Sequence, residues 1–202
     1  MELNQDLSII VTGGKAYHII PGEADGFGHC FGGPALHIDS EDENARLSLQ
    51  ALFHLNMDDS RLNSCNVASS QLHLYYGFKF DNCETQYRLN ESDELDLVGM
   101  TPNEPTPDWP YSNYPLDFPV VPVRLETAEF GSMRSLSESY AYFAKLQNCG
   151  GGFYPKKSTY VVVTPSEDLG VSLWGEDGDA AFVTVGYCID SKTGIIKGEQ
   201  GF

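Results

Sequence analysis

The sequence predicts a β-rich α+β domain with mainly antiparallel sheets and one clear helix. Three observations support this fold class. Many short stretches alternate apolar and polar residues or are β-branched, glycine and proline separate them, and one segment has helical periodicity. The 202 residues are 41% hydrophobic and 12% aromatic, which is enough apolar material for a buried core. This length fits one compact domain over residues 1–202.

The first strands are expected to form a hairpin. Residues 7–11 are mostly apolar and β-branched, Gly13 and Gly14 supply a tight turn, and residues 16–20 return as the second strand. Residues 71–80 alternate cleanly between apolar and polar side chains. This alternation predicts an antiparallel strand with one face on the core and the other half-solvated.

Other strands and one helix follow from similar local patterns. The remaining predicted strands are residues 47–55, 120–125, 159–164, 180–189 and 194–197. Ser135 and Glu138 form a capping box, and apolar residues recur at helical spacing after them until a run of glycines follows Cys149. These signals predict a helix over Ser135–Gln147.

Seven of the 11 prolines lie in residues 101–122. Because proline lacks the N–H that a sheet ladder needs, this segment is expected to be an extended surface loop. On either side of it, residues 47–78 and 160–187 share an order of strand, polar loop, strand, glycine and aromatic residue. The echo suggests a duplication of about residues 1–100 and 120–202 joined by the loop, although any two antiparallel strand pairs would look similar.

Charge is the strongest compositional signal. Twelve Lys and Arg residues against 29 Asp and Glu residues give a formal net charge of −17. This charge repels nucleic acids and anionic membranes, so neither is an expected partner, whereas a basic protein would be attracted. Excess acid also keeps many proteins in solution without any partner.

The chain is expected to be cytoplasmic. It has no apolar stretch near the roughly 20 residues that a membrane span needs, and its first residues lack the pattern of a signal peptide. Its five cysteines are widely spaced and form no CxxC pair, which favours reduced thiols over a disulfide framework.

Several short motifs resemble the YwqG-like family of uncharacterised bacterial proteins. They are Phe31 to Pro34 (FGGP), Leu49 to Asn56 (LQALFHLN), Leu72 to Phe78 (LHLYYGF), Glu167 to Gly170 (EDLG) and Trp174 to Gly178 (WGEDG). The sequence departs from the family where proline directly follows the glycine pair and where Glu176 replaces an aspartate. The resemblance implies a β-rich α+β domain of two related halves, no established enzymatic activity and a setting among bacterial toxin–immunity clusters.

One short stretch contains several residues of the metal-ligand type. His29, Cys30 and His37 lie close in sequence, but a zinc site needs four ligands, or three plus water, at characteristic spacing. Neither a metal site nor a cofactor is therefore predicted. The neighbouring Gly32 and Gly33 are interpreted as turn residues, since no phosphate-loop motif surrounds them.

Two histidines form the other candidate for chemistry. His54 and His73 lie on neighbouring predicted strands and could face one another. Together with Cys65 or Cys83 they would make a Cys-His nucleophile pair. No sequence motif supports such a pair, and structural histidines are commoner, so no catalytic residue is predicted.

The residues expected to contact a partner are aromatic side chains and carboxylates in predicted loops. They are Trp109, Tyr111, Tyr114, Trp174, Glu167, Asp168, Glu176, Asp177 and Asp179. Trp and Tyr are favoured interface anchors, and carboxylates steer a basic partner. The plainer interpretation is that the aromatic residues tether the loop and the carboxylates are merely solvated.

The sequence thus predicts a non-catalytic acidic protein that binds a basic protein. Its most concrete form is an immunity protein that neutralises a cognate toxin. The alternative is a small-molecule or cation-binding enzyme with its site between the two halves, for which His54, His73 and Tyr75 are the first residues to test.

Overall fold

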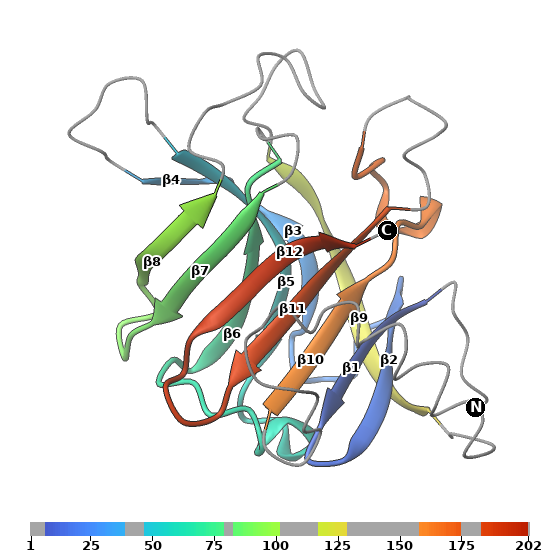
Figure 1. The fold of residues 1–202 in the computed structure, drawn as a ribbon. Coiled ribbons are helices and arrows are strands. Elements are labelled where there is room, and N and C mark those ends of the chain that lie inside the picture. The colour runs from blue at the N-terminus through green and yellow to red at the C-terminus, as the bar shows by residue number, and fades with distance from the viewer. Residues whose placement is uncertain are drawn as a thin grey trace.

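The computed structural model describes residues 7–38, 47–78, 83–101, 117–128, 158–174 and 183–201. Twelve strands in these ranges form one antiparallel sheet in the order β4-β5-β3-β9-β2-β1-β10-β11-β12-β7-β8, with β6 paired to β5. Figure 1 shows the sheet curling into a half-barrel, so that β6 lies beside β7 and β12.

The strands are β1 (Ser8–Thr12), β2 (Lys15–Pro21), β3 (Cys30–Gly33), β4 (Leu36–Ile38), β5 (Leu47–Asn56), β6 (Gln71–Tyr76), β7 (Glu84–Leu89), β8 (Leu95–Thr101), β9 (Phe118–Ala128), β10 (Ser158–Val163), β11 (Thr184–Asp190) and β12 (Ile196–Gly201). Two 3₁₀ turns, η2 (Ser60–Leu62) and η4 (Glu167–Leu169), are the helical elements of the described ranges. No helix in these ranges is long and apolar enough to cross a membrane.

The prediction of an α+β fold with one clear helix is wrong. The chain is nearly all sheet and has no helix beyond the short turns in its described part. The predicted helix, Ser135–Gln147, lies outside the described residues. The helical signal was local, whereas a sheet forms from segments far apart in sequence, and four of the paired strands (β3, β4, β7 and β8) went unrecognised.

Two of the predicted strand patterns are confirmed. β1 and β2 form a hairpin whose two-residue turn has Gly13 at φ 57° and Gly14 at φ 77°. Positive φ at both central residues is the requirement of a type I′ hairpin turn, which glycine meets without strain. In β6, Leu72, Leu74 and Tyr76 are fully buried while the alternate side chains are not.

The end of the proline-rich segment is not a surface loop. Pro119 and Pro122 lie within β9, in the middle of the sheet. The strand tolerates them because residues 118–122 pair with β3 on one edge, whereas residues 123–128 pair with β2 on the other. Pro119 therefore lies where β9 pairs with β3 alone, and Pro122 lies where the pairing changes edge, with its carbonyl accepting a hydrogen bond from the Gly22 N–H just past β2. At such positions a missing N–H removes few ladder bonds.

Gly32 and Gly33 also differ from their interpretation as turn residues, because both belong to β3. The register between β3 and β9 shifts between Phe31 and Gly33, as at a β-bulge. Gly32 has φ 77°, and a Cβ atom there would lie 2.1 Å from the carbonyl oxygen of Pro119. Close approach of the two backbones therefore requires glycine at this position.

The two proposed halves do not form separate blocks. The echoing segments do form antiparallel pairs, β5 with β6 and β10 with β11. However, β9 lies between β3 and β2, and β12 lies between β11 and β7. The strands of both halves thus interleave in one sheet, and their origin by duplication stays a prediction.

An aromatic cluster forms the centre of the main core, inside the curled sheet. Phe31 contacts Phe53 and Phe118, and Phe78 contacts Phe118 and Trp174 at ring-centroid distances between 5.0 and 5.8 Å. A second, smaller apolar cluster covers the opposite face of β1, β2, β9 and β10. β1, β10 and most of β2 are buried on both faces, which explains their nearly continuous apolar sequences, whereas β9 keeps several exposed residues.

The hydroxyl group of Tyr87 links the two ends of the curled sheet. Tyr87 lies on β7 and is completely buried. Its oxygen accepts a hydrogen bond from the Tyr75 N–H and donates one to the His73 carbonyl, both at 2.9 Å. These two backbone groups lie on the edge of β6. The Tyr87 hydroxyl therefore provides hydrogen bonds that a further paired strand would otherwise have to provide.

We expect Tyr87→Phe to lower the free energy of unfolding by about 2 kcal/mol, because it leaves two backbone groups of β6 without their partner. Urea unfolding followed by tryptophan fluorescence measures this change. The matched control is Tyr187→Phe, since the buried Tyr187 hydroxyl has no hydrogen-bond partner among the described residues. That variant is expected to be neutral or slightly more stable, and equal losses in both variants would contradict the bridging role of Tyr87.

Candidate functional site

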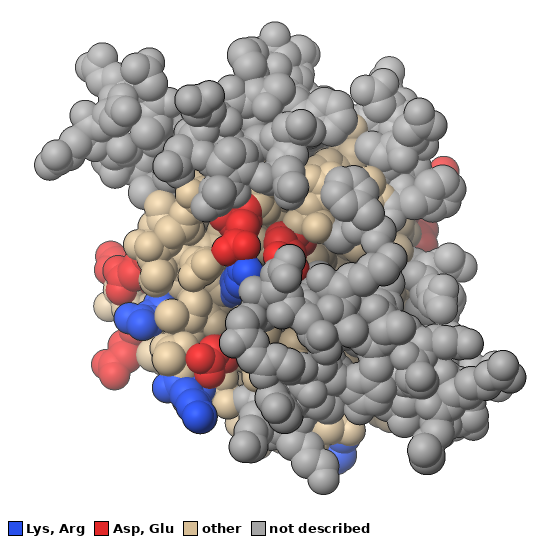
Figure 2. All heavy atoms as spheres, viewed as in Figure 1, with Lys and Arg blue, Asp and Glu red and all other residues tan. Residues whose placement is uncertain are grey.

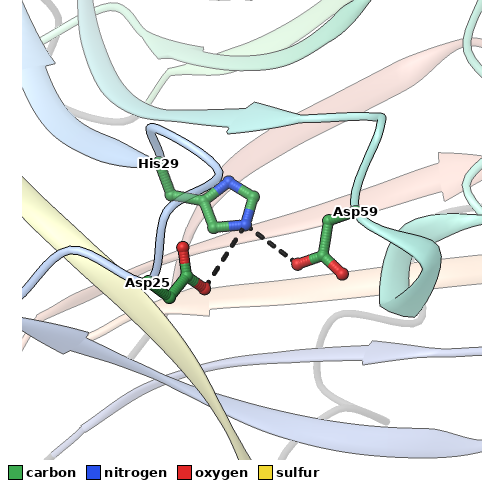
Figure 3. A group of neighbouring side chains, drawn as sticks. All are labelled: Asp25, His29 and Asp59. Atoms are coloured by element: carbon green, nitrogen blue, oxygen red, sulfur yellow. Dashed lines mark hydrogen bonds and ion pairs between the residues drawn. The ribbon is translucent and has the colours of Figure 1, made fainter.

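Two groups of polar side chains in the described residues have the composition of functional sites. The first consists of Asp25, His29 and Asp59, shown in Figure 3. Asp25 and His29 belong to the loop between β2 and β3, and Asp59 caps η2 after β5. His29 Nε2 lies 3.0 Å from Asp59 Oδ2 and 3.8 Å from Asp25 Oδ2. Two carboxylates and an imidazole at such spacing resemble a metal-ligand set.

A guanidinium group already occupies the space between the two carboxylates. One terminal nitrogen of Arg61 lies 2.5 Å from Asp25 Oδ2 and 2.6 Å from Asp59 Oδ2, and Nη1 donates to the Leu125 carbonyl. Burial alone would raise the pKa of both aspartates, but hydrogen bonds, first those from Arg61, hold the two pKa values below their usual range.

The proton on His29 also argues against a metal here. His29 Nδ1 accepts a hydrogen bond from the Asn56 N–H at 3.0 Å, so the proton of the neutral ring is on Nε2, which faces Asp59. A metal ion at Nε2 would have to displace both this proton and Arg61. The residues therefore do not fit a metal, and the group is best explained as an ion-pair network that attaches the β2–β3 loop to η2 and β9.

We expect Arg61→Met to lower the free energy of unfolding by about 2–4 kcal/mol, because it leaves two poorly solvated carboxylates unpaired. Arg61 is 26% exposed, and this exposure reduces the usual cost of breaking a buried ion pair. The depressed aspartate pKa values contribute stability above pH 3.8 that is lost as the pH falls further. This acid-sensitive contribution should shrink in the variant. Chemical denaturation between pH 3 and pH 7 measures both effects.

The matched control is Arg124→Met. Arg124 pairs with Glu23, whose side chain is 71% exposed, and with Glu126. Exposed ion pairs contribute under about 1 kcal/mol. A loss in Arg124→Met as large as that in Arg61→Met would show that loss of the arginine itself, and not of the buried network, causes the effect.

The second group is the histidine pair, in which His54 and His73 face one another, as their predicted strands allowed. They are register partners on β5 and β6, and their Nδ1 atoms are hydrogen-bond partners. The ring centroids lie 4.6 Å apart, and Tyr75 packs 6.2 Å from His54 and 5.9 Å from His73. All three side chains are half-buried. His73 alternates along β6 with the buried Leu72 and Leu74, whereas Tyr75 also packs against the core residue Tyr87, with ring centroids 6.1 Å apart.

The surroundings keep the histidine pair uncharged at neutral pH. Burial, followed by the charge of His73, lowers the pKa of His54 to about 4, while a hydrogen bond to the backbone of Gly32 acts in the opposite direction. Burial also lowers the pKa of His73, against the negative charge of Asp93. A hydrogen bond that raises the pKa of a histidine is one that it donates, so the Gly32 carbonyl is the acceptor.

The thiols do not join the histidines as the nucleophile model would require. Cys65 contacts the hydroxyls of Thr12 and Thr159, and burial raises the pKa of Cys83 to about 12. Cys30, which lies close in sequence to His29 and His37, is the register partner of His54 and belongs to β3. Burial raises its pKa too, so it is a thiol and not a reactive thiolate.

The two residues of the pair come from β5 and β6, which both belong to the first half of the chain. The alternative prediction of a site between two halves therefore does not describe their position. His37, which was grouped with His29 and Cys30, lies on β4 opposite Ser48. Sequence reasoning missed Asp25, Asp59 and Arg61, and no local signal marked them, because the fold alone brings the β2–β3 loop to η2.

The structure places only some of the predicted partner-binding residues. Six of them lie outside the described residues: Trp109, Tyr111, Tyr114, Glu176, Asp177 and Asp179. Trp174 is only 2% exposed, and its indole N–H donates to the Val183 carbonyl. It is therefore part of the core and not an accessible interface anchor. Glu167 and Asp168 are exposed in the first turn of η4, and their contact with a partner stays a prediction.

Sequence reasoning also missed an acidic turn between β7 and β8. Glu91, Asp93, Glu94 and Asp96 are all exposed there, and four carboxylates in six residues were a readable signal. Figure 2 shows acidic side chains along the β7–β8 edge of the sheet, with basic ones between them. This face is therefore mixed in charge.

Comparisons with protein family models, curated protein sequences and solved structures find no match to this chain. The resemblance to the YwqG-like family therefore stays a prediction.

We expect His54 to stay neutral until the pH approaches 4, because its protonation must overcome burial and, once His73 is charged, repulsion from that ring. Since the unfolded value is near 6.5, the neutral ring contributes stability that is full above pH 6.5 and is lost as the pH falls towards 4. Nitrogen-15 NMR of the imidazole rings measures the titration directly. A midpoint for His54 near 6.5 would contradict the assigned environment.

Proposed function

We propose that the protein binds a basic protein partner through exposed carboxylates at η4, in its most concrete form as an immunity protein that neutralises a cognate toxin. The observation that carries the proposal is the pair Glu167 and Asp168. Both are exposed, and neither forms an ion pair or a side-chain hydrogen bond within the described part of the chain. The sequence then continues with Glu176, Asp177 and Asp179.

The backbone that carries the η4 carboxylates is held in place by local contacts. Ser166 caps the turn by accepting a hydrogen bond from the Asp168 N–H, Leu169 is buried, and Gly170 ends the turn at φ 71°. Carboxylates held at fixed positions lose less conformational entropy on binding than those in a disordered tail. The chain has a net charge of −17, whose electrostatic field attracts basic partners, and the carboxylates at η4 make the negative potential stronger at that position.

The β7–β8 turn is the less suitable acidic surface. Asp93 accepts hydrogen bonds from Ser69 and Ser70, and Glu94 accepts one from Asn90. Two of its carboxylates therefore already accept hydrogen bonds within the protein. η4 (orange) and β8 (green) lie on opposite sides of the molecule in Figure 1, so a small partner would contact one surface and not both.

The test is co-purification and biolayer interferometry with the protein encoded next to this chain in its genome. We expect a complex at low salt whose association rate falls steeply as salt is raised, because electrostatic steering is screened. Replacing Glu167 with Gln and Asp168 with Asn should slow association several-fold with a smaller effect on dissociation, as for charges at the rim of an interface.

The control is the matched neutralisation of Glu91 to Gln and Asp96 to Asn on the β7–β8 turn, which removes the same charge from the opposite side. We expect it to change association by less than twofold, an effect of total charge only. The η4 assignment is wrong if both double variants slow association equally. Absence of any complex at low salt would count against the immunity function itself.

A further inference from the structure

We propose that His54 and His73 form a binding site for a divalent transition-metal ion, such as Cu²⁺ or Zn²⁺, with their two Nδ1 atoms as ligands. The inference is independent of the proposed partner binding, because it depends on residues of β5 and β6 and not on those of η4. Imidazole nitrogen is a ligand that copper, zinc and nickel all accept.

The two imidazole rings are oriented as a pair of metal ligands would be. Two side chains directly opposite each other on neighbouring antiparallel strands project from the same face with their Cβ atoms close together. Here the two rings turn their Nδ1 atoms towards one another. Two metal–nitrogen bonds of about 2.0–2.1 Å at a tetrahedral angle would separate the nitrogens by roughly 3.3 Å. A small rotation of either ring provides this separation.

His54 also makes a hydrogen bond with its other ring nitrogen. Its Nδ1 faces His73, so the donor to the Gly32 carbonyl is Nε2, which lies beside Gly33. A Cβ atom on Gly33 would be 3.3 Å from this nitrogen. The bond fixes the tautomer with the proton on Nε2 and a lone pair on Nδ1. Donation of the second ring N–H to a backbone carbonyl is the usual support of a metal-bound histidine.

His73 and the nearby Asp93 also suit a bound cation. Because His54 Nδ1 is an acceptor, the shared proton is on His73 Nδ1 in the metal-free pair. On metal binding this proton leaves Nδ1 and His73 takes up a proton at Nε2, so both rings stay neutral and no net proton is released. The Asp93 carboxylate interacts electrostatically with His73, and its negative charge favours a cation at this position.

The remaining coordination positions would be filled by water. Both rings are half-buried and thus reach solvent. The one set of three potential ligands with closely spaced atoms in the described ranges is Asp25, His29 and Asp59, which Arg61 and the His29 proton already occupy. The thiol of Cys30 is not part of such a set. The site is therefore a two-histidine site with open positions.

The experiment is a titration of the full chain with Cu²⁺ alone, and separately with Zn²⁺ alone, followed by calorimetry. Electron paramagnetic resonance of the copper form detects the bound nitrogens. We expect one tight equivalent per chain, hyperfine structure from two imidazole nitrogens and a higher melting temperature. His54→Gln and His73→Gln should each weaken binding at least about tenfold.

The matched control is Tyr75→Phe, which removes one hydroxyl beside the pair and should leave the affinity within about twofold. A loss in this variant equal to that in the histidine variants would overturn the ligand assignment. Affinity that neither histidine substitution changes would overturn the site.

If a histidine variant fails to fold, the ligand assignment is tested by a measurement on the unaltered chain. Nitrogen-15 NMR during the Zn²⁺ titration should shift the Nδ1 signals of His54 and His73 and leave that of the buried His29 in place. Shifts confined to other histidines would overturn the proposal.

Discussion

The closure of the curled sheet is the constraint on which the other features depend. A sheet with one apolar face must cover that face, and this chain does so by curling until β6 approaches β7 and β12. Curling leaves a strand edge facing inward, where unpaired backbone groups are costly. The Tyr87 hydroxyl meets this need by bonding to both an N–H and a carbonyl of β6. A buried side chain thus makes hydrogen bonds that a neighbouring strand would otherwise make.

The same closure determines what the polar face of the sheet can present. Because Leu72, Leu74 and Tyr76 of β6 face the core, His73 between them projects from the opposite face, and pairing with β5 brings His54 to the same place. A slip of one residue in this register would bury the imidazoles and expose leucines. The core and the histidine pair are therefore fixed by one register.

Charged side chains occur in two different arrangements in the described part of this protein. In the β2–β3 loop, Arg61 neutralises two carboxylates of low exposure, and the result is attachment of a loop to the sheet. At η4, exposed carboxylates form no ion pair with another described residue, and their field extends into solvent. Only the second arrangement can attract a partner, because charges already paired at short range contribute little at a distance.

The sequence by itself determined the parts that depend on local pattern. It predicted the first hairpin, since two consecutive glycines satisfy the backbone of its turn, and it predicted the two faces of β6 from alternation. It also placed His54 and His73 on neighbouring strands, where they could face one another. It did not determine the fold class, because a capping box is visible locally while the pairing of β3, β4, β7 and β8 is not. Only the tertiary structure showed that Pro119 and Pro122 belong to a central strand, that Trp174 is buried, and that Asp25, Asp59 and Arg61 meet. Each of these depends on contacts between segments distant in sequence, which no local pattern encodes.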